Sequence, residues 1–553
     1  MYIENINSPK DIKKLSVEQL SVLAEEVRTA LIRKLSEHGG HIGPNLGMVE
    51  TTIALHYVFN SPIDKIVFDV SHQSYVHKML TGRMAAFLDP AKYNDVTGYT
   101  NPDESEHDFF TIGHTSTSVS LAMGLAKGRD LTGGKENIIA VIGDGSLSGG
   151  EALEGLNNAA MLGSNMIIIV NDNDQSIAEN HGGLYKGLKE LRDTNGESPD
   201  NIFKAMGLEY YYLGDGHDVS ALIKLFTSVK DIDRAVVLHI HTIKGKGLKY
   251  AEENKEYWHA GGPFHIEDGS PKGPGWPVNE TVRESVLDLI EKRSDVVAIT
   301  AGTPSVIGFT EDYRKRAGKQ FVDVGIAEEH AVAMASGIAR NGGTPIFGVF
   351  SPFLQRTYDQ LSSDLCLNNN PAVIMVFMAS VYGMNSNTHL GIYDIPMISH
   401  IPNLVYLAPT SKEEYLAMFK YATTQKAHPI AIRIPMMMPE TGIEDTTDYS
   451  LLNKYQVVRK GSSVAIIALG DFFELGVQIA DKYKILTGND VTLINPKFIT
   501  GIDEELLECL KTDHKLVLTL EDGIVEGGFG QTIASFYGLS DMKVKNYGIK
   551  KSF

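Results

Sequence analysis

The feature that most constrains the fold of this chain is a pair of apolar runs that each end in a polar cluster. Residues 138–142 lead into Gly143-Asp144-Gly145, and residues 166–170 lead into Asn171-Asp172-Asn173. Short apolar runs of this kind are typical of strands that are buried on both faces of a parallel sheet. Asp144 and Asn173 lie 29 positions apart, which is the length of one strand–helix–strand unit. We therefore expect both side chains at the carboxyl ends of neighbouring strands, where open α/β sheets bind ligands.

The residue types in these two clusters suit a magnesium ion that carries a diphosphate. Mg²⁺ takes six oxygen ligands, of which one or two come from protein carboxylates, and it completes its shell with phosphate oxygens and water. Asp144, Asn173 and a carbonyl oxygen of Gln175 supply such a set, and Gly143 and Gly145 let the backbone approach an anion closely. A Gly-Asp-Gly segment alone is a common turn, but the second cluster at this distance favours the metal site.

Strand-like runs alternate with helical segments along the whole chain, which predicts an α/β fold of doubly wound, mostly parallel sheets. The runs form three groups, near 65–70, 138–142, 166–170 and 235–241; near 296–300, 344–349, 372–378 and 430–434; and near 463–469, 490–494 and 515–520. A Gly- and Pro-rich stretch at 261–277 and a polar stretch at 439–448 separate the groups. We therefore predict three domains, 1–275, 276–445 and 446–553. The glycines and charges of 181–201 predict a mobile surface loop.

Composition is ordinary for a soluble globular protein and excludes several other classes. With 553 residues, 43% hydrophobic and 22% charged, the chain can bury several cores. Its two cysteines, Cys366 and Cys509, do not form a disulfide framework and suit a reducing cytosol. The amino terminus lacks signal-peptide features and no apolar stretch reaches the length of a membrane span, so we expect a cytoplasmic protein. A net charge of −19 argues against nucleic acid as a partner.

Further motifs extend the pattern over nearly the whole chain. They are Gly40-His41, residues 69–78, residues 113–118, residues 215–218, residues 244–247, Trp258-His259, residues 327–331, residues 353–356 and Thr388-His389. In this order, and together with the two polar clusters, they resemble the 1-deoxy-D-xylulose-5-phosphate synthase family of the transketolase superfamily. The resemblance implies a diphosphate- and Mg²⁺-binding domain, a pyrimidine-binding domain and a transketolase C-terminal domain. It also implies a homodimer with thiamine diphosphate and Mg²⁺ as cofactors.

The same resemblance assigns roles to individual residues. Glu328 matches the glutamate that activates the aminopyrimidine ring, Lys244 a cation beside the diphosphate, Phe353 an aromatic stacked on the pyrimidine, and Arg356 a guanidinium near the donor carboxylate. The implied catalytic set is Glu328, His41, His259, His389 and Arg356. The implied cofactor-binding set is His72, Gly113, His114, Thr115, Ser116, Gly143, Asp144, Gly145, Ser146, Asn173, Lys244, Glu328 and Phe353, and the metal ligands are Asp144, Asn173 and Gln175. Structural alternatives are a helix-start acid for Glu328, a solvated loop for Lys244 and a core aromatic for Phe353.

The residues expected to recognise the acceptor depart from the family pattern. Where the family places two arginines and a tyrosine on the acceptor's phosphate, this chain has Met378, Met436 and Phe350, and Asn385 replaces an aspartate. Phosphate recognition depends on charge-assisted hydrogen bonds, whereas methionine offers an apolar, adaptable wall. Arg433 is either structural support or a displaced cation.

The resemblance implies an enzyme that decarboxylates pyruvate, a 2-oxo acid donor, and passes the two-carbon unit to an aldehyde acceptor. In the synthase family that acceptor is glyceraldehyde 3-phosphate, and family membership would place the chain in isoprenoid and thiamine biosynthesis. The altered acceptor residues leave open a divergent paralogue with an unphosphorylated or more apolar acceptor. A transketolase that acts on ketose phosphates and a non-catalytic thiamine diphosphate-binding protein are the remaining alternatives.

Overall fold

The computed structural model describes residues 1–273 and 279–553, with the side chain of Asn385 excluded. The predicted domain boundary at 275 therefore lies outside the described residues. The chain divides into two compact units. Unit 1 comprises Met1–Pro277 and Gly325–Ala327, and unit 2 comprises Val278–Val324 and Glu328–Phe553.

Unit 1 is built on one five-stranded sheet with the strand order β1-β2-β3-β5-β4, in which every neighbouring pair is parallel. Its strands are β1 (Lys65–Phe68), β2 (Ile138–Gly143), β3 (Met166–Asp172), β4 (Glu209–Leu213) and β5 (Ala235–His241). The two apolar runs that carry the polar clusters are β2 and β3, and they are hydrogen-bonded neighbours. This confirms that the two clusters lie at the carboxyl ends of neighbouring parallel strands.

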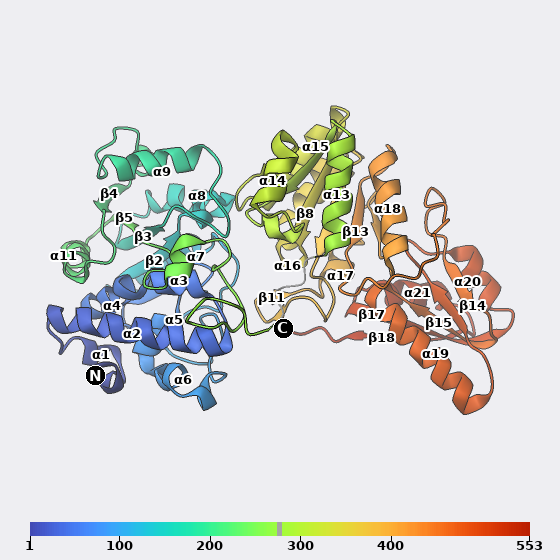
Figure 1. The fold of residues 1–553 in the computed structure, drawn as a ribbon, viewed down its shortest axis with the longest axis horizontal. Helices are drawn as coiled ribbons and strands as arrows, with labels where there is room; N and C mark the ends of the chain where they lie inside the picture. The colour runs from blue at the N-terminus through green and yellow to red at the C-terminus, as the bar shows by residue number, and fades with distance from the viewer. Residues whose placement is uncertain (274–278) are drawn as a thin grey trace. The chain divides into compact units, whose positions relative to one another are not determined.

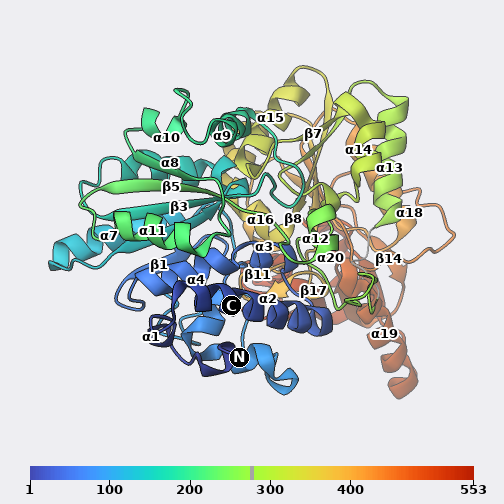
Figure 2. The ribbon, with the colours of Figure 1, turned by 60° about the vertical axis from the view of Figure 1, so that its left-hand side comes forward.

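Helices cover both faces of this sheet, as the figures show for α8 on one face and α4 and α11 on the other (Figures 1 and 2). The helices of unit 1 are α1 (Pro9–Ile12), α2 (Val17–His38), α3 (Ile42–Gly47), α4 (Val49–Val58), α5 (Tyr75–Lys78), α6 (Ala85–Leu88), α7 (Ser118–Thr132), α8 (Gly150–Ala159), α9 (Gly183–Asp193), α10 (Ile202–Ala205), α11 (Val219–Val229) and α12 (Lys249–Glu253). Within β2, Ala140 packs with α7 and α8 while Val141 packs with α4 and α11. Both faces of the strand are therefore buried, which explains its continuous apolar sequence.

The segment 181–201 is not a loop throughout, and that expectation is wrong, because it contains helix α9. Leu184, Leu188 and Leu191 recur at helical spacing, and the last two are fully buried against the core of unit 1. The glycines and charges around them obscured this apolar stripe, which is the ordinary signal of an amphipathic helix.

Unit 2 contains two larger sheets and a two-stranded pair. The first sheet is fully parallel, with the order β12-β13-β9-β8-β6-β7; the second has the order β14-β16-β15-β17-β18 and is parallel except for β14. The strands are β6 (Val296–Thr300), β7 (Phe321–Asp323), β8 (Thr344–Phe350), β9 (Val373–Phe377), β10 (Asn385–Ser386), β11 (His389–Leu390), β12 (Val405–Leu407), β13 (Ile430–Arg433), β14 (Gln456–Arg459), β15 (Ser463–Ala468), β16 (Thr492–Asn495), β17 (His514–Ile524) and β18 (Lys543–Ile549). The helices are α13 (Glu280–Lys292), α14 (Glu311–Ala317), α15 (Glu328–Arg340), α16 (Ser351–Leu354), α17 (Asp394–Ile398), α18 (Lys412–Thr424), α19 (Phe473–Thr487), α20 (Glu504–Leu510) and α21 (Phe529–Tyr537).

One buried cluster contains residues of both sheets of unit 2, for example Val376 of β9 and Ile467 of β15. Residue 445, the second predicted boundary, falls between β13 and β14. Because the two sheets share this core, the structure does not separate unit 2 into two domains. The three-domain organisation remains a prediction. The alternating α/β character with predominantly parallel sheets is confirmed.

Five strands of the larger sheets were not predicted, and each lies at a sheet edge: β4, β7, β12, β14 and β18. Four of them are half-buried or alternate with exposed positions, and β12 has only three residues. An edge strand has a neighbour on one side only, so its sequence lacks the long apolar run that reveals a central strand.

In the described part of the chain, no helix combines the length and the apolar character needed to cross a membrane.

Candidate functional site

Asp144 and Asn173 lie where the sequence places them, directly after β2 and β3. The Asp144 amide donates to the carbonyl of Asn171 at 3.0 Å, so the two polar clusters are joined through their backbones. Asp144 is 1% exposed and Asn173 is 8% exposed. Gln175 follows on the same loop and pairs with Glu179 in an isolated antiparallel bridge. We refer to Asp144, Asn173 and Gln175 as the metal cluster.

One side-chain oxygen of the metal cluster is buried without a hydrogen-bond partner among the described residues. The Oδ1 atom of Asn173 is buried and has no hydrogen-bond partner among the described residues. The described residues also contain no group of three or more histidine, cysteine or carboxylate side chains arranged for a metal. A cation here would therefore rely on one carboxylate with amide and carbonyl oxygens, which is a donor set that Mg²⁺ accepts.

Burial dominates the electrostatics of the metal cluster. Burial, and in second place the negative charge of Asp172, raises the pKa of Asp144 to about 7. The side chain of Asn180 donates from Nδ2 to Asp144 Oδ2 at 2.7 Å. Lys244, 2% exposed, donates from Nζ to the carbonyl of Ser176 at 2.5 Å, and burial lowers its pKa to about 7. A buried lysine that interacts with the carboxylate of Asp144 suits a diphosphate with its cation.

The backbone around Asp144 leaves no room for larger side chains. A Cβ atom on Gly145 would lie 2.8 Å from Ser176 Cβ and Oγ. Ser116, whose φ is +74°, donates from Oγ to the carbonyl of Ser146 at 2.7 Å. Its backbone amide donates to Asp69 at the end of β1 at 2.8 Å. These contacts bring the expected cofactor-binding segments 113–116 and 143–146 together, with Gly113 buried and His114 and Thr115 half-buried in the same loop.

Three of the expected histidines form a cluster in unit 1. The ring centroids of His41 and His72 are 5.0 Å apart, those of His72 and His259 5.2 Å, and those of His41 and His259 6.0 Å. Residues 40–42 and 259–261 meet through backbone hydrogen bonds, such as the one from the Ile42 amide to the carbonyl of His259 at 3.2 Å. Burial lowers the pKa of His41 to about 4 and that of His259 well below its usual range. Both are therefore neutral at pH 7 and can accept or relay a proton.

Two residues that contact this histidine cluster, Asn45 and Tyr99, were not predicted from the sequence. Asn45, fully buried, donates from Nδ2 to the carbonyls of His41 and of His72, at 2.7 Å in each case. Its Oδ1 accepts from the Tyr75 amide at 2.9 Å. The Tyr99 ring lies 5.7 Å from that of His41. A polar residue in the otherwise apolar segment after His41 was the available signal for Asn45.

Unit 2 holds the remaining expected residues. Glu328 begins α15 and is 3% exposed, and its Oε2 atom has no hydrogen-bond partner among the described residues. Burial raises the pKa of Glu328 to about 7, although the positive charge of Arg356 opposes the shift. The Phe353 ring is 5.5 Å from the ring of His389, whose Nδ1 lies 2.8 Å from Thr388 Oγ1. The structure thus brings Glu328 near Arg356, and Phe353 near His389.

The residues expected at the acceptor end are apolar and partly packed. Phe350 and Met378 pack against a buried cluster of the parallel sheet, and Met436 is half-buried. The side chain of Asn385 lies outside the described residues. The amides of Met436 and Met437 donate to the carboxylate of Asp471 at 3.1 and 3.3 Å. A negative group therefore already occupies two backbone donors beside Met436.

Arg433 is structural support and not a displaced cation. Its guanidinium is 3% exposed and forms ion pairs with Asp394 at 2.7 Å and with Asp522 at 2.6 Å. Tyr406 also donates to Asp394. Because its Nε, Nη1 and Nη2 atoms all donate to buried carboxylates, the guanidinium is not positioned to bind a phosphate.

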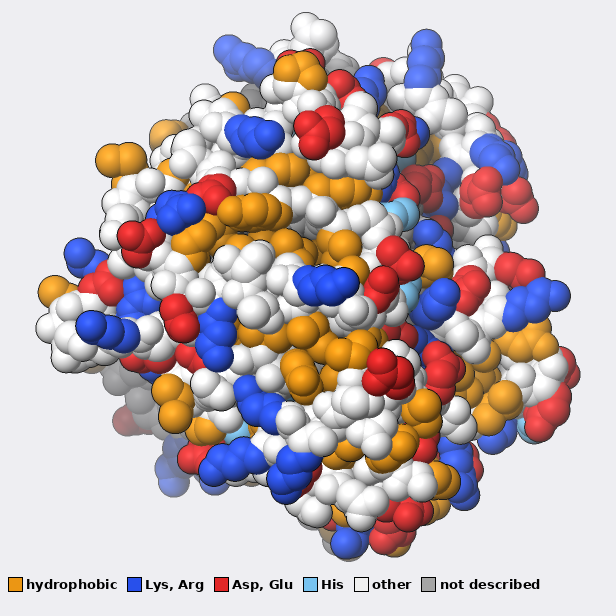
Figure 3. Space-filling view, turned by 90° about the vertical axis from the view of Figure 1, so that its left-hand side faces the viewer, with side chains coloured by type: hydrophobic (Ala, Val, Ile, Leu, Met, Phe, Trp, Pro, Cys, Tyr) orange, Lys and Arg blue, Asp and Glu red, His pale blue; other side chains and the backbone are white. Residues whose placement is uncertain are grey.

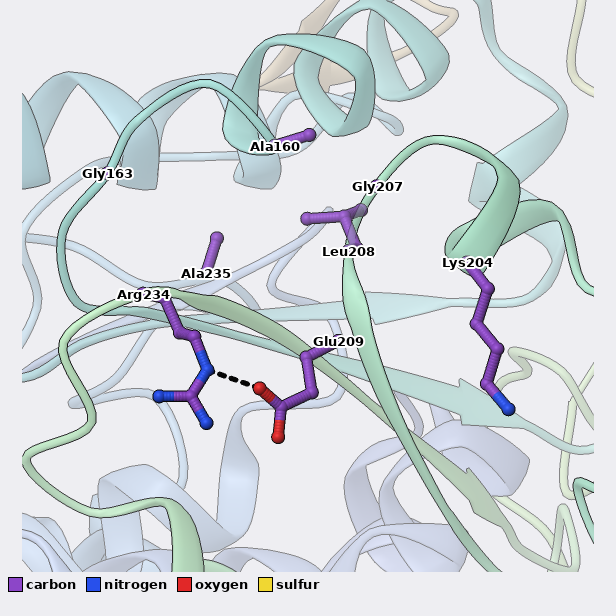
Figure 4. A pocket seen from close by; sticks show the side chains of 8 residues that line it. All are labelled: Ala160, Gly163, Lys204, Gly207, Leu208, Glu209, Arg234 and Ala235. Atoms are coloured by element: carbon purple, nitrogen blue, oxygen red, sulfur yellow. Dashed lines mark hydrogen bonds and ion pairs between the residues drawn. The ribbon is translucent and has the colours of Figure 1, made fainter.

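A cavity of about 420 Å³ opens elsewhere in unit 1 (Figure 4). Its lining includes Glu209 and Ala235, which begin β4 and β5, so it lies at the amino ends of these strands, away from the metal cluster. Arg234, which also lines it, pairs with Glu209. We assign this cavity no part in the chemistry.

Comparison with known proteins gives matches over nearly the whole chain. The family model described as 1-deoxy-D-xylulose-5-phosphate synthase matches residues 3–198 and 193–242, the transketolase pyrimidine binding domain matches 277–439, and the transketolase C-terminal domain matches 453–550. Curated relatives called 1-deoxy-D-xylulose-5-phosphate synthase come from Carboxydothermus hydrogenoformans, 37% identical over 100% of this chain and 94% of the relative, and from Clostridium beijerinckii, 37% identical over 100% and 95%. A third, from Lachnoclostridium phytofermentans, is 38% identical over 97% of this chain and 91% of the relative.

Proposed function

Because the chain belongs to the 1-deoxy-D-xylulose-5-phosphate synthase family, we propose that it is a thiamine diphosphate- and Mg²⁺-dependent transferase. It decarboxylates pyruvate and ligates the two-carbon unit to an aldehyde, with glyceraldehyde 3-phosphate as the leading acceptor. The observation that carries the proposal is full-length similarity to synthases combined with buried, available oxygens on Asn173 and Glu328. The transketolase alternative is weaker because the N-terminal family match is to the synthase.

The residues present fit the cofactor. Asp144, Asn173 and Gln175 would hold Mg²⁺, Lys244 would neutralise the diphosphate, and Glu328 would face the aminopyrimidine ring. When bound, thiamine diphosphate would supply the nucleophilic carbon and the electron sink that decarboxylation of a 2-oxo acid requires. The remaining chemistry, which is binding, orientation and proton movement, belongs to the side chains of this chain.

Glu328 is suited to hold a proton at neutral pH. A pKa of about 7 leaves the carboxyl group protonated in about half of the molecules at that pH, so Oε2 can share a proton with a ring nitrogen. The neutral His41 and His259 rings can pass protons to and from a reacting oxygen. Arg356 supplies a planar, permanently charged group for the pyruvate carboxylate.

A second candidate is a paralogue whose acceptor carries no phosphate. It is favoured by the contacts of Asp471, whose carboxylate is held by the amides of Met436 and Met437, and by the complete engagement of Arg433. A carboxylate close to an incoming phosphate would repel it, and apolar Met378 and Phe350 offer no compensating charge. The two candidates share the decarboxylation step and differ only in the acceptor.

The test is carbon dioxide release from pyruvate with Mg²⁺ and thiamine diphosphate, measured alone, with glyceraldehyde 3-phosphate, and with unphosphorylated glyceraldehyde. We expect release that the phosphorylated aldehyde stimulates, with deoxyxylulose phosphate identified by mass spectrometry. Stimulation by unphosphorylated glyceraldehyde but not by glyceraldehyde 3-phosphate would favour the second candidate. Absence of release under all three conditions, in protein that binds the cofactor, would contradict both and support the non-catalytic alternative.

We further propose that the protein is a cytoplasmic homodimer of three-domain chains whose ligands are small molecules. Family membership supports the dimer, which light scattering of the purified protein would test. On the face drawn in Figure 3, basic and acidic side chains are interspersed, so this face offers no concentrated basic surface for nucleic acid.

A further inference from the structure

Arg192, at the end of α9, contacts both aspartates that flank Asn173. Its Nη1 lies 2.5 Å from Oδ2 of Asp172, and its Nη2 forms a second ion pair with Asp174. Asp172 is fully buried, whereas Asp174 is about half-exposed. One guanidinium thus bridges the residues before and after an expected metal ligand, in the fork geometry for which arginine is suited.

Asp172 is also held from its other side. His239 of β5 donates from Nε2 to Asp172 Oδ2 at 2.7 Å, and Tyr210 of β4 donates to Nδ1 of the same ring at 2.8 Å. His239 is fully buried, so the hydrogen bonds that link Tyr210, His239 and Asp172 lie within the sheet. Arg192 is the only one of these partners that comes from outside the sheet, on the helix that the sequence did not predict.

The turn that these contacts hold is strained. Asp174 has a φ of +66°, in the left-handed region that residues other than glycine, asparagine and aspartate rarely adopt, and its backbone amide donates to Asp172 Oδ1 at 3.1 Å. The turn places Asn173 so that its Oδ1 is buried without a partner among the described residues. A strained turn persists only when its surroundings enforce it, and the described surroundings of Asp174 include Arg192 and, at 3.7 Å, Nε2 of His241.

We propose that Arg192 is a positioning residue for Mg²⁺. It docks α9 on the loop that follows β3 and holds residues 172–174 in the conformation that presents Asn173 and Gln175. The inference rests on the proposed function, in which these residues bind Mg²⁺ with the cofactor. The guanidinium touches neither metal nor substrate and acts through Asp172 and Asp174. Partners that orient metal ligands commonly contribute about 10- to 100-fold to metal affinity.

The positioning role and simple electrostatics predict opposite changes in Mg²⁺ affinity when Arg192 is removed. Removing a positive charge close to a cation site would strengthen Mg²⁺ binding if charge were all that mattered. Weaker binding after loss of Arg192 would therefore isolate the positioning effect.

The experiment titrates Mg²⁺ into Arg192→Ala, Arg192→Lys and wild-type protein at saturating thiamine diphosphate, with intrinsic fluorescence as the binding signal. We expect at least about a tenfold higher Kd for Mg²⁺ in Arg192→Ala and partial recovery in Arg192→Lys, with kcat near that of wild type at saturating Mg²⁺. Lys189→Ala is the matched control, because Lys189 lies on the same helix and pairs only with exposed Asp193 in the described structure. Its Kd should not change.

An unchanged or lower Kd in folded Arg192→Ala would overturn the inference. If that variant does not fold, Asp174→Asn replaces it, which removes the half-exposed ion pair with Arg192 and the 3.7 Å contact with His241. An Asp174→Asn Kd within twofold of wild type would then count against the positioning role. Failure of the wild-type protein to bind Mg²⁺ with thiamine diphosphate would instead contradict the proposed function, so the two failures are distinguishable.

Discussion

Replacement of Asn45 by alanine should uncouple the histidine cluster while leaving the fold of unit 1 in place. Its side chain makes three buried hydrogen bonds, of 2.7, 2.7 and 2.9 Å, that join the backbone at His41, at His72 and at Tyr75. At about 1 kcal/mol net for each bond, the loss of unfolding free energy is about 3 kcal/mol. For a unit of this size such a loss lowers Tm by roughly 5 °C.

The functional loss should exceed what this destabilisation explains. Without the amide bridge, the loops that carry His41 and His72 can separate, and a shift of about 1 Å in a catalytic constellation can cost about 100-fold in rate. We therefore expect kcat/KM for pyruvate to fall by about two orders of magnitude at a temperature where the variant is fully folded. Asn45→Asp, which keeps the acceptor for the Tyr75 amide but loses both donors, should fall at least as far.

Asn165→Ala is the matched control. Asn165 is also buried and makes comparable hydrogen bonds, to the Ile138 amide at 3.1 Å, to Asn137 at 3.0 Å and to the carbonyl of Ile232 at 2.9 Å, but at the amino end of β3. Urea denaturation should report a similar stability loss for both variants, and carbon dioxide release should report a large activity loss only for Asn45→Ala. If Asn45→Ala stays within threefold of wild type, or if both variants lose activity equally, the reasoning is wrong.

The remaining predictions concern unit 2. Because burial raises the pKa of Glu328 from 4.5 to about 7, the folded apoprotein binds this proton more tightly than the unfolded chain, and the free energy of unfolding should fall as pH rises through that interval. Glu328→Gln should remove this dependence and make the apoprotein more stable than wild type at pH 8, by up to about 3 kcal/mol, but not at pH 4; urea denaturation at both pH values checks it, and equal slopes would contradict it. Arg433→Met should lower the unfolding free energy by about 3–5 kcal/mol because it leaves Asp394 and Asp522 as unpaired buried charges. Adding Asp394→Asn and Asp522→Asn should restore much of that loss, and failure to do so would show that packing, not charge, dominates there.

The sequence was sufficient to predict the central strands and the position of Asp144 and Asn173 directly after β2 and β3. Strands β2 and β3 are buried on both faces, so each carries a continuous apolar run. The polar residues that follow these runs therefore lie at the carboxyl ends of the strands. The edge strands other than β1, such as β4 and β18, were not predicted because a strand with a neighbour on one side only is less buried and lacks a long apolar run. Helix α9 escaped because surrounding glycines and charges hid its leucine stripe.

What the sequence by itself determined is which residue types the candidate site can offer, because short motifs such as Gly143-Asp144-Gly145 and the start of α15 at Glu328 carry their residue types and their local geometry together. Only the tertiary structure decided how distant side chains combine. It engaged Arg433 between two buried carboxylates, placed Asn45 across two histidine loops, and set Arg192 on the aspartates beside Asn173. These contacts join residues far apart along the chain or on elements whose docking has no local signature, and burial, which sets the pKa of Asp144 and Glu328, exists only once the chain has folded.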